Sequence, residues 1–265
     1  MPNATLPAPP PTNRERREQA RLAREAAARE LRRRRVRVLG GATLVITLAI
    51  AALVLMGGRD HAAAPAAGPP AGVAEVDAML AGVPQDGIAL GDPGAPVTLV
   101  EFADMQCPFC RDFARQTLPL VVRDYVRTGK VRLEFRPLAF LGPDSERAAA
   151  VVAGAAAQHR LWQMADLFYS NQGRENSGYA TDAFLRRLLD GIPGLDVRRA
   201  LQDAASPAAD RLLADAEALA RRHAIASTPS FLIGRTGAVE RATLAGAPDY
   251  ATLRARLDAL LRKRP

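Results

Sequence analysis

The stretch V-T-L-V-E-F-A-D-M-Q-C-P-F-C, residues 97–110, decides the fold class of this chain. Residues 97–102 form a short, mostly apolar run that is typical of a buried strand. Cys107 follows after a brief loop, and Pro108 occupies a position that suits the first turn of a helix. The stretch therefore predicts a strand, a loop and then a helix that carries the pair Cys107 and Cys110 at its beginning.

Cys107 and Cys110 are the only cysteines of the chain. A thiol at a helix N-terminus faces unpaired backbone N–H groups and the positive end of the helix dipole, which both favour the thiolate. We therefore expect Cys107 to be the nucleophile. Cys110, one turn later on the buried side, is expected to form and break a disulfide with it. The alternative is a pair of inert buried thiols, which does not account for their spacing at a helix start.

The order of the other predicted elements completes the fold class. A helix predicted over 108–126 is followed by a strand at 131–135, and residues 143–223 then carry helical patterns alone. The last predicted elements are strands at 230–233 and 238–244 around the turn 235–237, and a helix at 250–261. This order is that of an α/β core of thioredoxin type, interrupted by a helical insertion at about 141–225.

Three stretches resemble the membrane-anchored and secreted DsbA-like thiol-disulfide oxidoreductases. They are residues 97–110, A-S-T-P-S-F-L-I-G at 226–234, and L-W-Q-M-A-D-L-F-Y at 161–169, which is similar to the helical insertion of that family. The similarity covers about residues 85–263. It implies a thioredoxin fold and thiol–disulfide exchange by Cys107 and Cys110, with no cofactor.

The resemblance also implies roles for residues around the two cysteines. Pro229 would be a cis-proline facing the disulfide, with Thr228 turned toward the site; a trans Pro229 that opens a strand is the alternative. Glu101 aligns with the acidic residue on the strand before the redox helix. If buried, it would have a raised pKa and relay a proton to or from Cys110, whereas an exposed strand glutamate would not. Asp104 is a weaker candidate that we expect in a loop or turn.

Phe109 departs from the most familiar sites of this family, which carry histidine before the second cysteine. Its ring cannot donate a hydrogen bond, so we expect a less acidic Cys107 and a less oxidising disulfide than at a site with histidine. Phe109 adds an apolar surface for substrate instead.

A membrane anchor is predicted at residues 38–58, which are 21 residues without a charge. As a helix they would span about 30 Å, the thickness of a bilayer core. Residues 1–37 carry a net charge of +7, so the positive-inside rule predicts a single-pass protein with these residues in the cytoplasm. A cleaved signal peptide is the alternative, although its apolar region is usually only about 7–15 residues long.

The part after the anchor is predicted to be extracytoplasmic. Residues 59–75, rich in Ala, Pro and Gly, are expected to form a linker, and residues 76–265 the DsbA-like domain. Outside the basic segment the net charge is close to +1, which gives no argument for nucleic-acid binding. A metal site is not expected either, because the histidines available beside two cysteines are His61, His159 and His223.

The sequence therefore favours an extracytoplasmic oxidase of cysteine pairs in exported proteins, recycled by a membrane redox partner. A disulfide isomerase or a reductase of the same fold remains an alternative. So does a non-catalytic anchored chaperone or binding module that uses the groove around Phe109. The direction of electron flow, the substrates, the redox partner and the oligomeric state stay open.

Overall fold

The computed structural model describes residues 68–262, except for the side chains of residues 239–243. The predicted basic segment at 1–37, the predicted anchor at 38–58 and most of the predicted linker lie outside this range. Within residues 68–262, none of the helices has both the length and the apolar character that crossing a bilayer demands.

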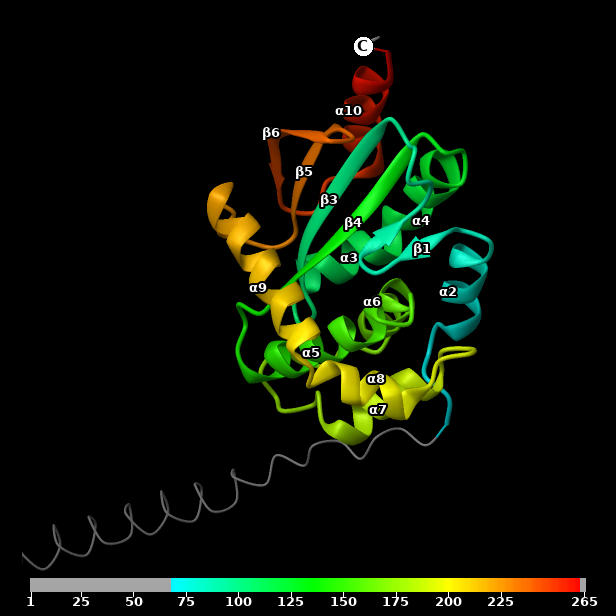
Figure 1. Cartoon of the computed structure of the whole chain (residues 1–265), viewed down its shortest axis with the longest axis vertical. Coiled ribbons are helices and arrows are strands. Elements are labelled where there is room, and N and C mark those ends of the chain that lie inside the picture. The colour runs from blue at the N-terminus through cyan, green and yellow to red at the C-terminus, as the bar shows by residue number, and fades with distance from the viewer. Residues whose placement is uncertain (1–67, 263–265) are drawn as a thin grey trace, which may run out of the picture. The chain divides into compact units, whose positions relative to one another are not determined.

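A six-stranded sheet in the order β1-β2-β4-β3-β5-β6 forms the centre of the described residues (Figure 1). Its strands are β1 (Gln85–Asp86), β2 (Ala89–Leu90), β3 (Val97–Asp104), β4 (Val131–Leu138), β5 (Ser230–Arg235) and β6 (Ala238–Ala245). β3 and β4 pair in parallel, and the other neighbouring strands pair antiparallel. Every residue of β3 is buried, because helices cover both faces of the sheet there.

Helices surround the sheet, and five of them, α5 to α9, make up the predicted insertion. The described helices are α2 (Val73–Leu80), α3 (Pro108–Gln116), α4 (Leu118–Val121), the π-helical turn η1 (Val122–Val126), α5 (Pro143–Ala156), α6 (Leu161–Ser170), α7 (Asp182–Asp190), α8 (Val197–Ala204), α9 (Pro207–Arg222) and α10 (Tyr250–Arg262). Side chains of Thr181, Asp196 and Ser206 cap α7, α8 and α9, which explains why these helices begin where they do. In Figure 1, α5 to α8 gather at one end of the sheet and α10 lies at the other.

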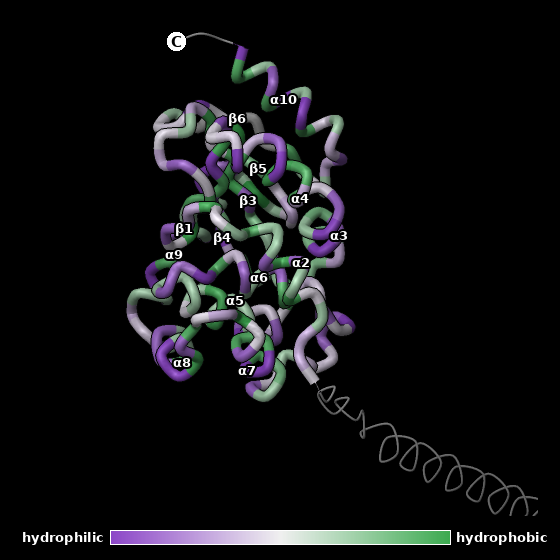
Figure 2. Tube along the Cα trace, turned by 90° about the vertical axis from the view of Figure 1, so that its right-hand side faces the viewer, coloured by the Kyte–Doolittle hydropathy of each residue, from purple (hydrophilic) through white to green (hydrophobic). Residues whose placement is uncertain are grey.

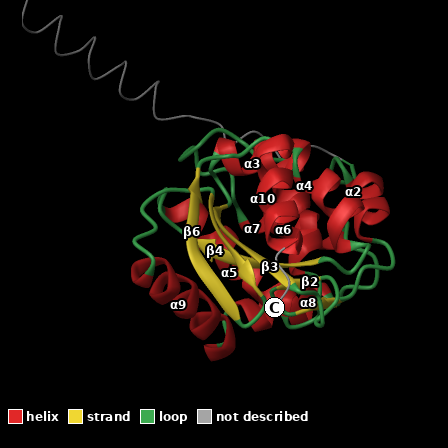
Figure 3. Cartoon of the chain, turned by 90° about the horizontal axis from the view of Figure 1, so that it is seen from above, coloured by secondary structure: helices red, strands yellow, loops and turns green. Residues whose placement is uncertain are grey.

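The two faces of the sheet contribute to different hydrophobic clusters. Leu99 and Ala103 of β3 join the larger cluster, which includes residues of α3, α5 and α6. Val100 and Phe102 join a smaller cluster with residues of α9. Figure 3 shows α9 on one side of the sheet and α3, α4 and α10 on the other. Since side chains alternate along a strand, Glu101 shares the face of Leu99 and Ala103 and points into the larger cluster.

The insertion shares its core with the rest of the fold. Trp162, Phe168 and Tyr169 of α6 are buried. The Trp162 ring meets the Phe135 ring of β4 edge-on, with centroids 5.6 Å apart. Hydropathy follows this arrangement in Figure 2, where the central strands are largely hydrophobic and hydrophilic stretches appear on α8 and α9.

Two details differ from the predicted elements. The helix predicted over 108–126 is interrupted at Thr117 and continues as α4 and η1, because Pro119 has no backbone N–H to continue the hydrogen bonds of α3. The sequence does not predict α2, β1 and β2. Because α2 begins at Val73, the last three residues of the predicted linker 59–75 are helical.

Candidate active site

Cys107 lies where β3 ends and α3 begins. It is the N-cap residue of α3, and Pro108 follows in the first turn, as predicted. The turn between strand and helix is closed by the backbone N–H of Cys107, which donates to the carbonyl oxygen of Asp104 at 3.1 Å. The central strand therefore delivers this thiol directly to the open N–H groups of a helix.

The second wall of the site comes from the other end of the domain. The Thr228–Pro229 peptide bond is cis, as the resemblance implied. In its protonated form the Cys107 thiol donates to the carbonyl oxygen of Thr228, with Sγ and O 3.2 Å apart, across 121 positions of sequence. The antiparallel pairing of β5 with β3, in which Ser230 lies opposite Phe102, brings these two segments together.

Cys107 is an acidic thiol, with its pKa lowered to about 6. The hydrogen bond from the Cys110 thiol is the largest cause. The Thr228 hydroxyl and the backbone N–H groups of Cys110 and Phe109 add to it, while burial opposes them. Thus Phe109, whose ring cannot donate, still stabilises the thiolate through its main chain.

Cys110 has the opposite character. It is fully buried, and burial raises the pKa of its thiol well above the usual range. The hydrogen bond that it donates to Cys107 and the nearby charges of Cys107 and Glu101 raise the pKa further. Both cysteines are free thiols in this structure. At neutral pH the pair therefore consists of a Cys107 thiolate and a protonated Cys110.

Glu101 is buried, which excludes the exposed glutamate that alternation along the strand left open. It is 3% exposed, and its neighbours in register are Phe135 of β4 and Phe231 of β5, both buried. This apolar surrounding raises the pKa of Glu101 well above its usual value, and the charge of Asp166 raises it further. Its Oε1 atom has no hydrogen-bond partner within residues 68–262.

Asp104 is not the loop or turn residue that we expected. It is the last residue of β3 and fully buried. Its carboxylate accepts hydrogen bonds from the backbone N–H groups of Gln106 (2.8 Å), Phe140 (2.7 Å) and Leu141 (3.1 Å) and from the Ser145 hydroxyl (2.5 Å). Because four hydrogen-bond donors satisfy this carboxylate, it can be buried at the end of a strand without a cationic partner.

Side chains of the insertion hold the active-site turn, and the sequence does not predict this role. Tyr169 donates its hydroxyl to the carbonyl oxygen of Asp104 at 3.2 Å. Gln172 donates its amide to the carbonyl oxygens of Met105 (2.7 Å) and Cys107 (3.2 Å). These contacts span more than sixty positions, so local sequence patterns carry no signal for them.

Two aromatic rings remain exposed near the site. Phe109 is 61% exposed and Phe140 is 50% exposed, and they are the large hydrophobic residues most open to solvent within the described range. Phe109 is the residue between the two cysteines of α3, and the backbone of Phe140 is bonded to Asp104. The acidic thiol is therefore accompanied by an apolar surface.

A family model described as thioredoxin matches residues 84–259. The chain belongs to the thioredoxin family. It is 29% identical over 180 residues to the probable disulfide bond formation protein D of Bacillus anthracis. This alignment covers 66% of this chain and 78% of that relative. It is 33% identical over 118 residues to the Bacillus cereus protein of the same name, covering 43% of this chain and 55% of the relative.

Two solved structures share this fold. Oxidised BdbD from Bacillus subtilis superposes with a TM-score of 0.59 at 20% identity, covering 68% of this chain and 98% of BdbD. A thioredoxin-like oxidoreductase from Silicibacter pomeroyi DSS-3 has a TM-score of 0.54 at 26% identity, covering 71% of this chain and 98% of that one. With the Cys107–Cys110 pair, this family member is a DsbA-like thiol-disulfide oxidoreductase, with helices inserted into an α/β thioredoxin fold.

Proposed function

We propose that this thioredoxin-family enzyme oxidises cysteine pairs of exported proteins outside the cytoplasm. The observation that carries the proposal is the opposite acidity of its two thiols, with the pKa of Cys107 at about 6 and that of Cys110 raised. A stabilised thiolate favours the reduced form of the pair, and it therefore makes the disulfide the stronger oxidant. The names of the Bacillus relatives, disulfide bond formation proteins, agree with this direction.

The exchange proceeds in two balanced steps. A substrate thiolate attacks Sγ of Cys107, the Cys107–Cys110 bond breaks, and Cys110 leaves and takes up a proton that Glu101 supplies. A second substrate thiolate then attacks the substrate sulfur of the mixed disulfide, and Cys107 leaves as a thiolate. The substrate loses two electrons and two protons; one proton stays on Cys110 and the other is released.

The surroundings of the site suit extended protein substrates. The cis peptide at Thr228–Pro229 turns the Thr228 backbone toward Cys107, where a substrate strand can pair with it. The exposed rings of Phe109 and Phe140 offer apolar contacts. In this proposal the segment at 38–58 anchors the enzyme with residues 1–37 in the cytoplasm, and a membrane redox partner removes the two electrons after each cycle.

The reduction potential of the full-length protein tests the direction of the reaction. We expect a potential well above that of thioredoxin, in the range of about −180 to −120 mV. The variant Cys107→Ser should lose all oxidation of a reduced model protein. Cys110→Ser, offered the oxidised form of that protein, should accumulate a mixed disulfide, because Cys107 attacks the disulfide of the model protein and no second thiol resolves the product. A potential near roughly −270 mV, as in thioredoxin, would contradict an oxidase and favour a reductase. Reshuffling of a scrambled substrate without net oxidation would favour an isomerase.

A further inference from the structure

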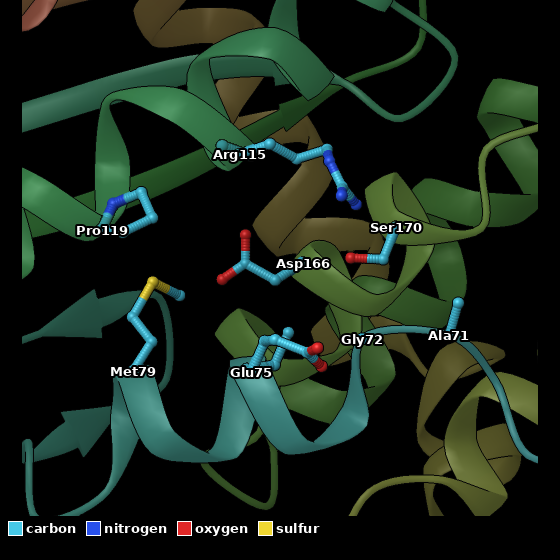
Figure 4. A pocket seen from close by; sticks show the side chains of 10 residues that line it. Ala71, Gly72, Glu75, Met79, Arg115, Pro119, Asp166 and Ser170 are labelled. Atoms are coloured by element: carbon cyan, nitrogen blue, oxygen red, sulfur yellow. The ribbon is translucent and has the colours of Figure 1, made fainter.

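A cavity of about 460 Å³ lies between α2, α3 and α6, apart from the Cys107 surface. Its lining includes the exposed residues Glu75 of α2 and Arg115 of α3, so water reaches it. Figure 4 shows the carboxyl group of Asp166, from α6, among the lining side chains, between Arg115 and Pro119 on one side and Met79 and Glu75 on the other.

Asp166 is an unusual residue to find there. It is only 6% exposed, and its Oδ2 atom has no hydrogen-bond partner within the described part of the chain. Burial raises the pKa of Asp166 to about 8. A buried carboxyl oxygen without a hydrogen-bond partner lowers the stability of a protein, so its presence calls for an explanation in function.

Asp166 also interacts with the redox site. Its charge raises the pKa of Glu101, and the charge of Glu101 in turn raises the pKa of Cys110. α6 packs against α3, which carries Cys110, and the Glu101 side chain points into the cluster that both helices share. The buried groups therefore form a series that begins at the cavity. The charge of Asp166 raises the pKa of Glu101, and the charge of Glu101 raises the pKa of Cys110.

We propose that Asp166 is the second carboxyl group of a proton path that joins the buried Cys110 thiol, through Glu101, to water in this cavity. The proposal rests on the thiol–disulfide chemistry proposed above. When Cys110 attacks a mixed disulfide on Cys107, the bond from Cys107 to the partner sulfur breaks and the Cys107–Cys110 bond forms. The partner leaves as a thiolate, and the Cys110 proton passes to Glu101, then to Asp166, then to water. The reverse reaction returns the proton along the same path.

The charged groups near Asp166 do not change the cause of its raised pKa. Glu75 of α2 and Arg115 of α3 line the same cavity, and the charge of Asp166 acts on Glu101 of the sheet. Tyr169, on the same helix, interacts with Glu101 and keeps its own proton because burial raises its pKa well above the usual range. Glu75 and Arg115 are exposed, so water screens them, and burial remains the cause of the Asp166 shift.

The reaction of the reduced full-length protein with the disulfide reagent DTNB separates the two thiols. The first equivalent of thionitrobenzoate reports attack by Cys107, and the second reports attack by Cys110 on the Cys107 mixed disulfide. In Asp166→Asn we expect the second phase to slow by about tenfold or more, since positioned proton transfer contributes factors of about 10² to 10⁴. The first phase should not change.

The pH profile gives a signature that a loss of packing would not produce. In the wild type the rate of the second phase should rise as the pH increases through about 8, where Asp166 becomes able to accept a proton. Asp166→Asn should lose this rise, and Asp166→Glu should restore part of it. The matched control is Glu75→Gln, which removes an exposed acid from the same cavity and should leave both phases unchanged.

Each other outcome contradicts the path. An unchanged second phase in Asp166→Asn would mean that the proton reaches solvent without Asp166. Equal slowing of both phases would mean that Asp166 supports only the packing of the site. Failure of the wild type to release the second equivalent would instead overturn the exchange chemistry itself, which separates the two proposals.

Discussion

Cys107 and Cys110 sit one helical turn apart and differ in acidity because of their surroundings. Cys107 lies at the helix end, where thiol, hydroxyl and N–H donors converge on its sulfur. Cys110 is enclosed in the core, and Glu101 is close enough for its charge to act on it. A thiolate that leaves easily and a thiol that holds its proton are the two partners that an oxidant needs.

The Thr228 hydroxyl contributes to this difference, and its removal tests the contribution. We expect Thr228→Val to raise the pKa of Cys107 by up to about 1 unit, since a hydrogen bond to a charged group contributes about 1.5 kcal/mol. The disulfide should become less oxidising. The pH dependence of Cys107 alkylation by iodoacetamide measures the pKa, and Thr128→Val, in the exposed turn after η1, is the control. Equal alkylation profiles for wild type and Thr228→Val would show that the hydroxyl has no part.

The sequence predicts the reacting residues better than their environment. Cys107 and Cys110 follow from a local motif, because a helix start is encoded by adjacent residues, and the cis Pro229 follows from the family resemblance of residues 226–234. Alternation along a strand could not predict the burial of Glu101, since both faces of β3 are covered. Asp166 sits within an apolar helical stretch, and only the packing of three separate helices makes a cavity next to it.

At the scale of elements, Asp104 joins the end of β3 to the beginning of α5. Its four accepted hydrogen bonds hold the turn before Cys107, the backbone at Phe140 and Leu141, and the Ser145 hydroxyl. The redox turn and the first helix of the insertion are therefore fixed to one carboxylate.

Replacement of Asp104 should be costly to stability. We expect Asp104→Ala to lower the free energy of unfolding by about 3 kcal/mol, because several buried donors lose a charged acceptor. Urea denaturation of the reduced protein measures the change. Asp210→Ala, an exposed acid in the first turn of α9, should cost less than about 1 kcal/mol. Similar losses in the two variants would contradict a structural role for Asp104.

α5 and α8 pack closely at Gly154. A Cβ atom at this position would lie 2.3 Å from the Ala200 carbonyl oxygen and 2.6 Å from the Ala204 backbone nitrogen. We expect Gly154→Ala to destabilise the protein by about 2 kcal/mol, because overpacking outweighs the gain in helix propensity of about 1 kcal/mol. Gly94→Ala, in an exposed loop, is the control and should change stability by less than about 0.5 kcal/mol. A Gly154→Ala variant more stable than the wild type would contradict this close packing, because it would mean that α8 can shift away from α5 at no cost.

The longer elements follow from the sequence, and the short ones do not. Apolar patterns predict β3, β4 and α10 close to their observed bounds. β1 and β2 have two residues each, too few for any period to be visible. α2 follows an Ala/Pro/Gly-rich stretch whose composition favours a linker, and its helix is stabilised by tertiary packing of Val76 and Leu80 in the core.

At the scale of the whole molecule, the acidity of Cys107 makes the stability of the reduced form depend on pH. The pKa of Cys107 is lower in the folded protein than in the unfolded one, so at this group the unfolded protein binds more protons between pH about 6 and about 8.5. The contribution of Cys107 to the stability of the reduced protein therefore rises with pH across this window, by about 3 kcal/mol at most, and is lost as the pH falls through 6. The raised pKa values of Asp166 and Glu101 act in the opposite direction, and these two groups titrate in the oxidised protein as well.

Comparison with the oxidised protein isolates this effect. The oxidised form lacks the thiol but keeps Glu101 and Asp166, and the stabilisation from its disulfide does not depend on pH in this range. Urea denaturation measures the free energy of unfolding of both forms from pH 5.5 to 8.5. This free energy should increase for the reduced form relative to the oxidised form as the pH increases. A constant difference would contradict the lowered pKa of Cys107.

The 121 positions between Cys107 and Thr228 also have a consequence for the order of events during synthesis. A chain is made from its N-terminus, so Cys107 exists well before the segment that completes its site. Until α9 has docked and β5 has paired with β3, the sulfur lacks the Thr228 wall. An unfinished molecule therefore lacks the contribution of Thr228 to the acidity of Cys107, and we expect the thiol to reach its full acidity only when the whole domain has folded.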